Sequence, residues 1–137
     1  MTTKQGRKED DMRGKYYMAD AERDVMEVLW RFPEGLNQSR LLEQVNEAGK
    51  DWKRQTLNTL VTRLMDKELV TREKRHVCAL MTKEEYCNIQ IEEVIDDVYD
   101  GKFTNLVIAF TKRNKISSEE AVQLQKLLED YDNNGVN

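Results

Sequence analysis

One stretch of the chain, DWKRQTLNTLVTRLMDKELVTREK from Asp51 to Lys74, limits the possible folds more than any other. Its apolar residues recur at the spacing of a helix that buries one face, and they are Leu57, Leu60, Val61 and Leu64. This pattern predicts a helix from about Lys53 to Glu68. Residues 69–75 and 77–81 are then predicted to form two short strands, which a tight basic turn joins. An amphipathic helix that runs directly into a hairpin is therefore the first constraint on the fold.

Two further helices are predicted before this stretch. The first begins near Asp20, its expected N-cap, and ends at Pro33 and Gly35, because proline cannot continue a helix and glycine supplies a turn. The second begins at Asn37, which can cap it, and ends at Gly49. Three short helices followed by a hairpin are the element order of a winged helix-turn-helix, whose third helix enters the major groove of DNA.

The outer face of the predicted third helix is rich in Thr, Asn, Gln and Arg, whereas an ordinary surface helix carries mostly Glu and Lys. Such side chains donate and accept the hydrogen bonds that base edges offer. No carboxylate, which phosphates would repel, occurs between Lys53 and Asp66. The composition alone fits a solvated polar face of a small helical domain equally well. The helix order, the acid-free face and the basic hairpin together favour DNA binding.

The formal net charge is −4, but the charge is unevenly distributed along the chain. Residues 53–76 hold seven basic and three acidic residues, a balance of +4. Within this range Lys53, Arg54, Lys74 and Arg75 can neutralise phosphates, a contact that orients a protein on DNA without reading the sequence. The positive charge thus coincides with the predicted helix and hairpin.

The second part of the chain begins at Thr82, and three more helices are predicted there. The sequences TKEE at Thr82 and SSEE at Ser117 are capping boxes, and Gly101 ends the first of the three helices. These helices carry more apolar surface than a three-helix segment can bury alone, so we expect two copies of the chain to pair through them. The residues expected at this interface are Ile91, Ile95, Val98, Phe103, Leu106, Val107, Phe110, Leu124 and Leu128.

The predicted fold is therefore mainly α with a small β-hairpin, divided into three parts. A mobile N-terminal arm is expected over residues 1–18, a winged helix-turn-helix domain over 19–81 and a three-helix dimerisation domain over 82–137. A homodimer suits DNA reading, because two modules about one helical turn apart, roughly 34 Å, reach successive faces of the major groove.

The sequence offers no arrangement for catalysis, for a metal or for a cofactor. His76 is the only histidine, no glycine-rich phosphate loop occurs, and Cys78 and Cys87 do not have the spacing of metal ligands. We expect both cysteines to be buried or partly buried free thiols. No run approaches the roughly 20 apolar residues of a membrane span, and the N-terminus has no signal-peptide pattern, so the expected location is the cytoplasm.

Over about residues 19–131 the chain resembles the penicillinase repressor family, the BlaI/MecI type, which also includes copper-responsive members. The resemblance rests on AERDVMEVLW, on DWKRQTLNTLVTRLMDKELV, and on VYDGKFTNLVIAF followed by KISSEEAVQLQKLLE. The chain departs from the family pattern at two places. Lys53 and Arg54 stand where the family often has Ser-Pro at the start of the recognition helix, and the hairpin lacks the usual glycine. No Cys-x-Cys pair of the copper-responsive branch is present.

This resemblance implies a homodimeric, non-enzymatic repressor that binds dyad operators with TACA/TGTA-like half-sites, and the expected targets are antibiotic-resistance genes. The base-reading residues that it implies are Gln55, Thr56, Asn58, Thr59 and Arg63. The phosphate-contacting residues are Arg40, Lys53, Arg54, Lys74 and Arg75. In the antibiotic-responsive branch a sensor-linked protease cuts the dimerisation helix, and the matching bond here is Ala109–Phe110. The alternative is a winged-helix protein-interaction module that does not bind an operator.

Overall fold

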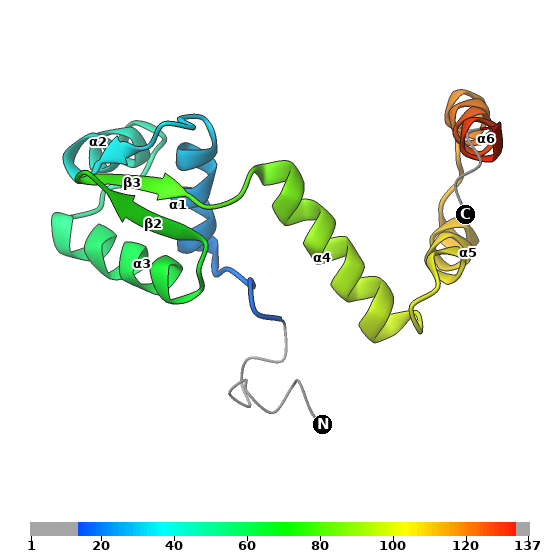
Figure 1. The fold of residues 1–137 in the computed structure, drawn as a ribbon, viewed down its shortest axis with the longest axis horizontal. Helices are drawn as coiled ribbons and strands as arrows, with labels where there is room; N and C mark the ends of the chain where they lie inside the picture. Colours follow the sequence, from blue (N-terminus) through cyan, green and yellow to red (C-terminus); the bar gives the residue numbers. More distant parts are fainter. Residues whose placement is uncertain (1–13, 134–137) are drawn as a thin grey trace. The chain divides into compact units, whose positions relative to one another are not determined.

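The computed structural model describes residues 14–133, which form helices and one small sheet (Figure 1). The prediction of a mobile arm over 1–18 mainly concerns residues 1–13, which lie outside the described residues. The elements in chain order are α1 Asp20–Trp30, β1 Leu36–Asn37, α2 Gln38–Glu47, α3 Arg54–Asp66, β2 Val70–Glu73, β3 His76–Ala79, α4 Lys83–Val98, α5 Phe103–Arg113 and α6 Ser118–Asn133. The predicted mainly α fold with a winged-helix order is confirmed.

The chain divides into two compact units, Met1–Glu93 and Val94–Asn137. The division falls inside α4, whereas the sequence places a domain boundary at Thr82, before that helix. The start of α4 packs with the first unit because Tyr86, in its first turn, is only 4% exposed and belongs to the core. The separation of a DNA-binding part from a dimerisation part at Thr82 stays a prediction.

The core of the first unit is built from the apolar faces of α1, α2 and α3, closed by the sheet. Its fully buried residues come from each of these elements, and the largest are Met26, Leu29, Leu41, Leu57, Leu64 and Leu69. Met18 is 7% exposed and joins the same core from the segment before α1. Each apolar stripe therefore meets the others in one hydrophobic cluster, as amphipathic helices require.

The sheet has three antiparallel strands in the order β1-β3-β2. The sequence predicts only the hairpin and misses β1, because a two-residue strand has no periodicity of its own. Leu36 and Asn37 become a strand by pairing with Val77 and His76 of β3. Asn37 also caps α2, as expected, since its side chain accepts a hydrogen bond from the backbone N–H of Arg40 at 2.8 Å.

The start of α1 differs from the prediction. Ala19, not Asp20, is the N-cap, and Asp20 is the first helical residue. The cap interaction comes from the third helical position, where a carboxylate oxygen of Glu22 accepts from the backbone N–H of Ala19 at 3.1 Å. The glutamate half of a capping box thus fixes the helix start without a capping side chain at the N-cap.

The capping box predicted at Thr82 is confirmed. The backbone N–H of Thr82 donates to Glu85 at 2.9 Å, and that of Glu85 donates to the Thr82 hydroxyl at 3.0 Å. At Ser117 the hydroxyl accepts from the backbone N–H of Glu120 at 3.0 Å. Both contacts satisfy backbone donors that a helix start otherwise leaves unpaired.

Tyr86 and Trp30 join the start of α4 to α1. Their ring centroids are 5.6 Å apart, and the Trp30 indole N–H donates to the carbonyl of Met81 at 3.0 Å. The Tyr86 hydroxyl donates to the carbonyl of Tyr16 at 3.1 Å. Burial raises the pKa of the Tyr86 hydroxyl, so the phenol stays neutral and remains a donor at physiological pH.

The cysteine expectation holds for one residue and fails for the other. Both are free thiols, but Cys78 is partly buried in β3 while Cys87 is exposed on α4. Cys87 follows the buried Tyr86 directly and so points to another side of the helix. No helix among the described residues is long and apolar enough to cross a membrane.

Candidate nucleic-acid interface

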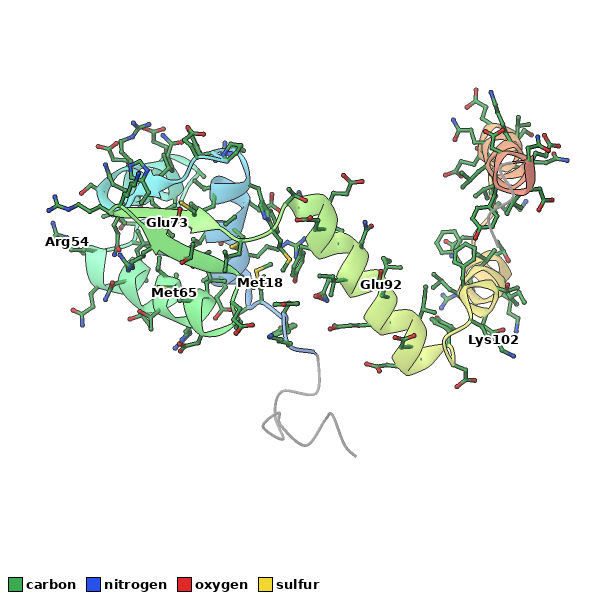
Figure 2. The ribbon with its side chains drawn as sticks, in the orientation of Figure 1. Met18, Arg54, Met65, Glu73, Glu92 and Lys102 are labelled. Carbon is green, nitrogen blue, oxygen red and sulfur yellow. The ribbon has the colours of Figure 1, made fainter. Side chains whose placement is uncertain are left out.

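The third helix, α3, has two distinct faces. Leu57, Leu60, Val61 and Leu64 are buried, as their spacing predicts. The other residues of the helix between Arg54 and Arg63 are exposed, and they include Gln55, Thr56, Asn58, Thr59 and Thr62. Every residue that the resemblance implies as base-reading is therefore on the exposed side. In Figure 2 the side chain of Arg54 extends away from the unit at the N-terminal end of this helix.

The helix α3 ends in a Schellman motif, two residues before the predicted boundary at Glu68. Glu68 has a φ of 64°, and the backbone N–H groups of Glu68 and Leu69 donate to the carbonyls of Met65 and Leu64 at 3.0 and 2.9 Å. Leu64 and Leu69 are both fully buried, which adds the apolar contact typical of this motif. The helix thus ends at a defined point and turns directly into β2.

The turn between α2 and α3 is fixed by one side chain, Asn46. Its Oδ1 accepts from the backbone N–H of Trp52 at 2.9 Å, and its Nδ2 donates to the carbonyl of the same residue at 3.2 Å. Lys50 in the same turn forms an ion pair with Asp24 of α1 at 2.9 Å. These contacts set the direction in which α3 leaves the turn. Sequence reasoning missed Asn46, because its partner is a backbone group and not a complementary side chain.

At its other end α3 is attached to α1 and to the segment before it. The Lys67 ammonium donates to Glu22 at 2.5 Å and to the carbonyl of Tyr17 at 2.6 Å. The Glu22 side chain is 4% exposed, so its charge is shielded from water and depends on this partner. Lys67 therefore holds the helix in place and is not one of the charges available to DNA.

The hairpin is a compact basic wing formed by β2 and β3. Its two turn residues, Lys74 and Arg75, have φ values of 50° and 70°, as in a type I′ turn. The flanking residues Glu73 and His76 pair with each other across the strands. The sequence places Arg75 in a strand, but the structure places it in the turn, where its side chain and that of Lys74 are exposed.

The predicted phosphate-contacting residues are all exposed, but they differ in their surroundings. Lys53, Arg54, Lys74 and Arg75 form no ion pair with another described residue, and the same holds for Arg63. Arg40, on α2, is paired with Glu43 at 3.6 Å. An unpaired surface cation is the feature that a polyanion can exploit, so the first group is the stronger candidate.

The start of α2 lies beside the start of α3. Gln38, Ser39 and Leu42 of α2 line a surface depression together with Arg54 and Leu57 of α3. Gln38 also donates a hydrogen bond to Asn58 at 3.4 Å, and Arg72 of β2 donates to the same Asn58 oxygen at 3.3 Å. Gln38 and Arg72 are thus part of this surface, although sequence reasoning did not select them.

The second unit presents an apolar surface of a different kind. None of the residues described between Val94 and Asn133 is buried. A groove of about 530 Å³ between α5 and α6 is lined by several of the predicted interface residues, and these are Phe103, Leu106, Val107, Phe110 and Leu124. The others, Ile91, Ile95, Val98 and Leu128, are exposed or partly buried on α4 and α6. The Ala109–Phe110 bond lies inside α5, where Phe110 is 56% exposed.

Comparison with known proteins agrees with this architecture. The family model described as "Penicillinase repressor" matches residues 18–130. The methicillin resistance regulatory protein MecI of Staphylococcus aureus strain N315 is 27% identical over 117 residues, covering 82% of this chain and 94% of that protein. The penicillinase repressor of Bacillus licheniformis is 23% identical over 120 residues, covering 85% and 92%. The chain therefore belongs to the penicillinase repressor family, the BlaI/MecI type of DNA-binding transcriptional repressors.

Proposed function

We propose that two copies of this chain form a repressor dimer on a dyad operator, each copy reading one half-site with the outer face of α3. The observation that carries the proposal is the exposed, acid-free face between Arg54 and Arg63, next to a wing whose turn is Lys74-Arg75. Polar side chains on this face offer donors and acceptors to base edges, while unpaired cations at both ends attract phosphates. Repression then follows because the bound dimer blocks access of the polymerase.

The second unit supports the dimer in this proposal. Large apolar side chains on α5 and α6 are exposed in the single chain, for example Phe103 at 60% and Leu128 at 64%. A soluble protein rarely leaves a contiguous surface of this kind in water. A twofold partner that presents the same groove would cover both copies at once, as an isologous interface does.

The names of the relatives suggest the regulated genes. One relative is described as a methicillin resistance regulator and another as a penicillinase repressor, so we infer β-lactam resistance genes as the targets, and the cytoplasm as the location. Release by a sensor-linked protease would require cleavage at Ala109–Phe110. Because this bond lies within a helix, whose backbone is hydrogen-bonded, α5 would have to unwind locally before a protease could bind it.

The test is the binding of the full chain to a duplex from its own promoter region, measured by fluorescence anisotropy against a shuffled duplex of equal composition. We expect clear preference for the promoter duplex. Arg63→Ala should abolish most of this preference, because a bidentate arginine–base contact gives roughly 1–3 kcal/mol of discrimination. Lys74→Ala should weaken binding to both duplexes alike.

Circular dichroism and a urea midpoint for each variant serve as controls for folding. Equal affinity of the unmodified chain for both duplexes would reject operator reading and favour the protein-interaction alternative. Equal losses of preference in Arg63→Ala and Lys74→Ala would reject the division of roles between α3 and the wing.

A further inference from the structure

The side-chain oxygen of Asn58 accepts hydrogen bonds from two neighbouring elements. Nη2 of Arg72, on β2, lies 3.3 Å from Oδ1 of Asn58, and Nε2 of Gln38, at the start of α2, lies 3.4 Å from the same atom. Asn58 itself is on the exposed face of α3, in the middle of the candidate base-reading residues. One carboxamide therefore connects the recognition helix to both α2 and the wing.

The chemistry of arginine determines which way this carboxamide faces. A guanidinium group only donates hydrogen bonds, so the atom of Asn58 that faces Arg72 has to be the oxygen. A carboxamide turned by half a rotation would place its NH₂ group, also a donor, against the guanidinium. The Nδ2 group of Asn58 consequently lies on the opposite side, and it forms no hydrogen bond with any residue that the structure describes.

This orientation limits what Asn58 can do in a major groove. A carboxamide oxygen has two lone pairs that can accept hydrogen bonds. In Asn58 one accepts from Arg72 and the other from Gln38. The usual bidentate contact of asparagine with adenine needs that oxygen to accept from N6 while Nδ2 donates to N7. Asn58 retains only its two N–H donors. Adenine N7 can still accept from such a donor, but the adenine N6 amino group is itself a donor and then finds no acceptor on Asn58. Guanine, with acceptors at N7 and O6, and thymine, with an acceptor at O4, carry no donor of their own in the major groove and therefore suit a donor-only side chain better.

We propose that Arg72 and Gln38 are positioning residues that hold Asn58 as a pure hydrogen-bond donor, so that it favours guanine or thymine over adenine. The inference rests on the proposed function, because it requires α3 to lie in the major groove. It adds a specificity rule that the residue type alone does not predict, since a free asparagine would favour adenine.

The test is a selection of randomised duplexes by the full chain, followed by sequencing of the bound fraction. The base that Asn58 contacts is identified as the position whose preference is lost in Asn58→Ala. At this position we expect the unmodified chain to favour guanine or thymine over adenine. Arg72→Ala should shift the ratio toward adenine by about tenfold, within the range of one bidentate contact.

Gln38→Ala provides a second variant that changes no charge, and it should shift the same ratio in the same direction. Lys74→Ala is the matched control: it removes a wing cation that makes no contact with Asn58, so it should lower affinity and leave the ratio unchanged. All of these side chains are exposed or half-buried, and circular dichroism of each variant checks that the fold is retained.

The proposal is overturned if the unmodified chain prefers adenine at that position, if Asn58→Ala alters no position, or if Arg72→Ala leaves the ratio unchanged. In each of these cases the unmodified chain still selects a motif, so operator reading itself survives. Failure of the unmodified chain to select any motif overturns the proposed function and this inference together.

Discussion

At the residue scale, the contact that most directly holds the recognition helix is the pair between Lys67 and Glu22. The two residues are 45 positions apart in the sequence, and their atoms are 2.5 Å apart in the fold. The Glu22 side chain is almost completely buried, while that of Lys67 is 26% exposed. A buried carboxylate without its cation is strongly unfavourable, because the charge is then neither hydrated nor paired.

We therefore expect Lys67→Met to lower the free energy of unfolding by about 3 kcal/mol. The double variant Glu22→Gln, Lys67→Met should lose much less, because the neutral amide still accepts from the Ala19 N–H. Lys50→Met, which breaks the more exposed pair with Asp24, is the matched control and should cost less than about 1 kcal/mol. Urea unfolding followed by circular dichroism measures all three. A Lys67→Met loss no larger than that of Lys50→Met would contradict this role.

At the element scale, the periodicity of apolar residues made the helices predictable and left the connections between them undetermined. Leu57, Leu60, Val61 and Leu64 define α3 from the sequence alone, because each must face the same core. The strand β1 exists only through its partner β3, and the contact of Arg72 with Asn58 depends on how the wing folds back on α3. Interactions of this kind, between segments far apart in the chain, leave no pattern in the local sequence from which they could be predicted.

The wing carries a conformational cost that a glycine in its turn would avoid. Lys74 and Arg75 both have positive φ, a region that costs an ordinary side chain roughly 1 kcal/mol or more and that asparagine and glycine tolerate. The presence of two cations at these positions is consistent with a role for their charges.

Replacing Lys74-Arg75 by Asn-Gly should therefore make the protein more stable and a weaker DNA binder. We expect a gain of about 1 kcal/mol in unfolding free energy. The slope of log affinity against log salt should become shallower by up to about 1.8, since each lost phosphate contact contributes about 0.9. Thermal unfolding and anisotropy titrations at several salt concentrations test the two effects separately. An unchanged salt slope would show that the wing does not contact phosphates.

At the scale of the whole molecule, the two units differ in how far each one buries its apolar residues. The first unit has a continuous core, whereas no described residue of α5 or α6 is buried. The excess of apolar residues after Thr82 already indicates this difference in the sequence. The surface that covers these residues in the proposed dimer belongs to a second copy of the chain, so the structure of one chain does not contain it.

Leu124→Glu should weaken dimerisation by at least about tenfold, because it places a charge in the apolar groove between α5 and α6. Gln125→Glu is the matched control: it adds the same charge to α6 at a residue that does not line the groove. Sedimentation equilibrium measures the monomer–dimer constant of each variant. If both variants dimerise as the unmodified chain does, the groove is not the interface.

The proposed repressor requires two α3 helices, held by one dimer, to read two half-sites of one operator. Its most direct test is the affinity of the full chain for operator duplexes in which only the spacing between the half-sites is varied. Inserting about five base pairs, half of the roughly ten in a helical turn, turns one half-site to the opposite side of the duplex. We predict that this insertion reduces affinity to that of a single half-site. Equal affinity for the original and the inserted duplex would show that one dimer does not read the two half-sites together.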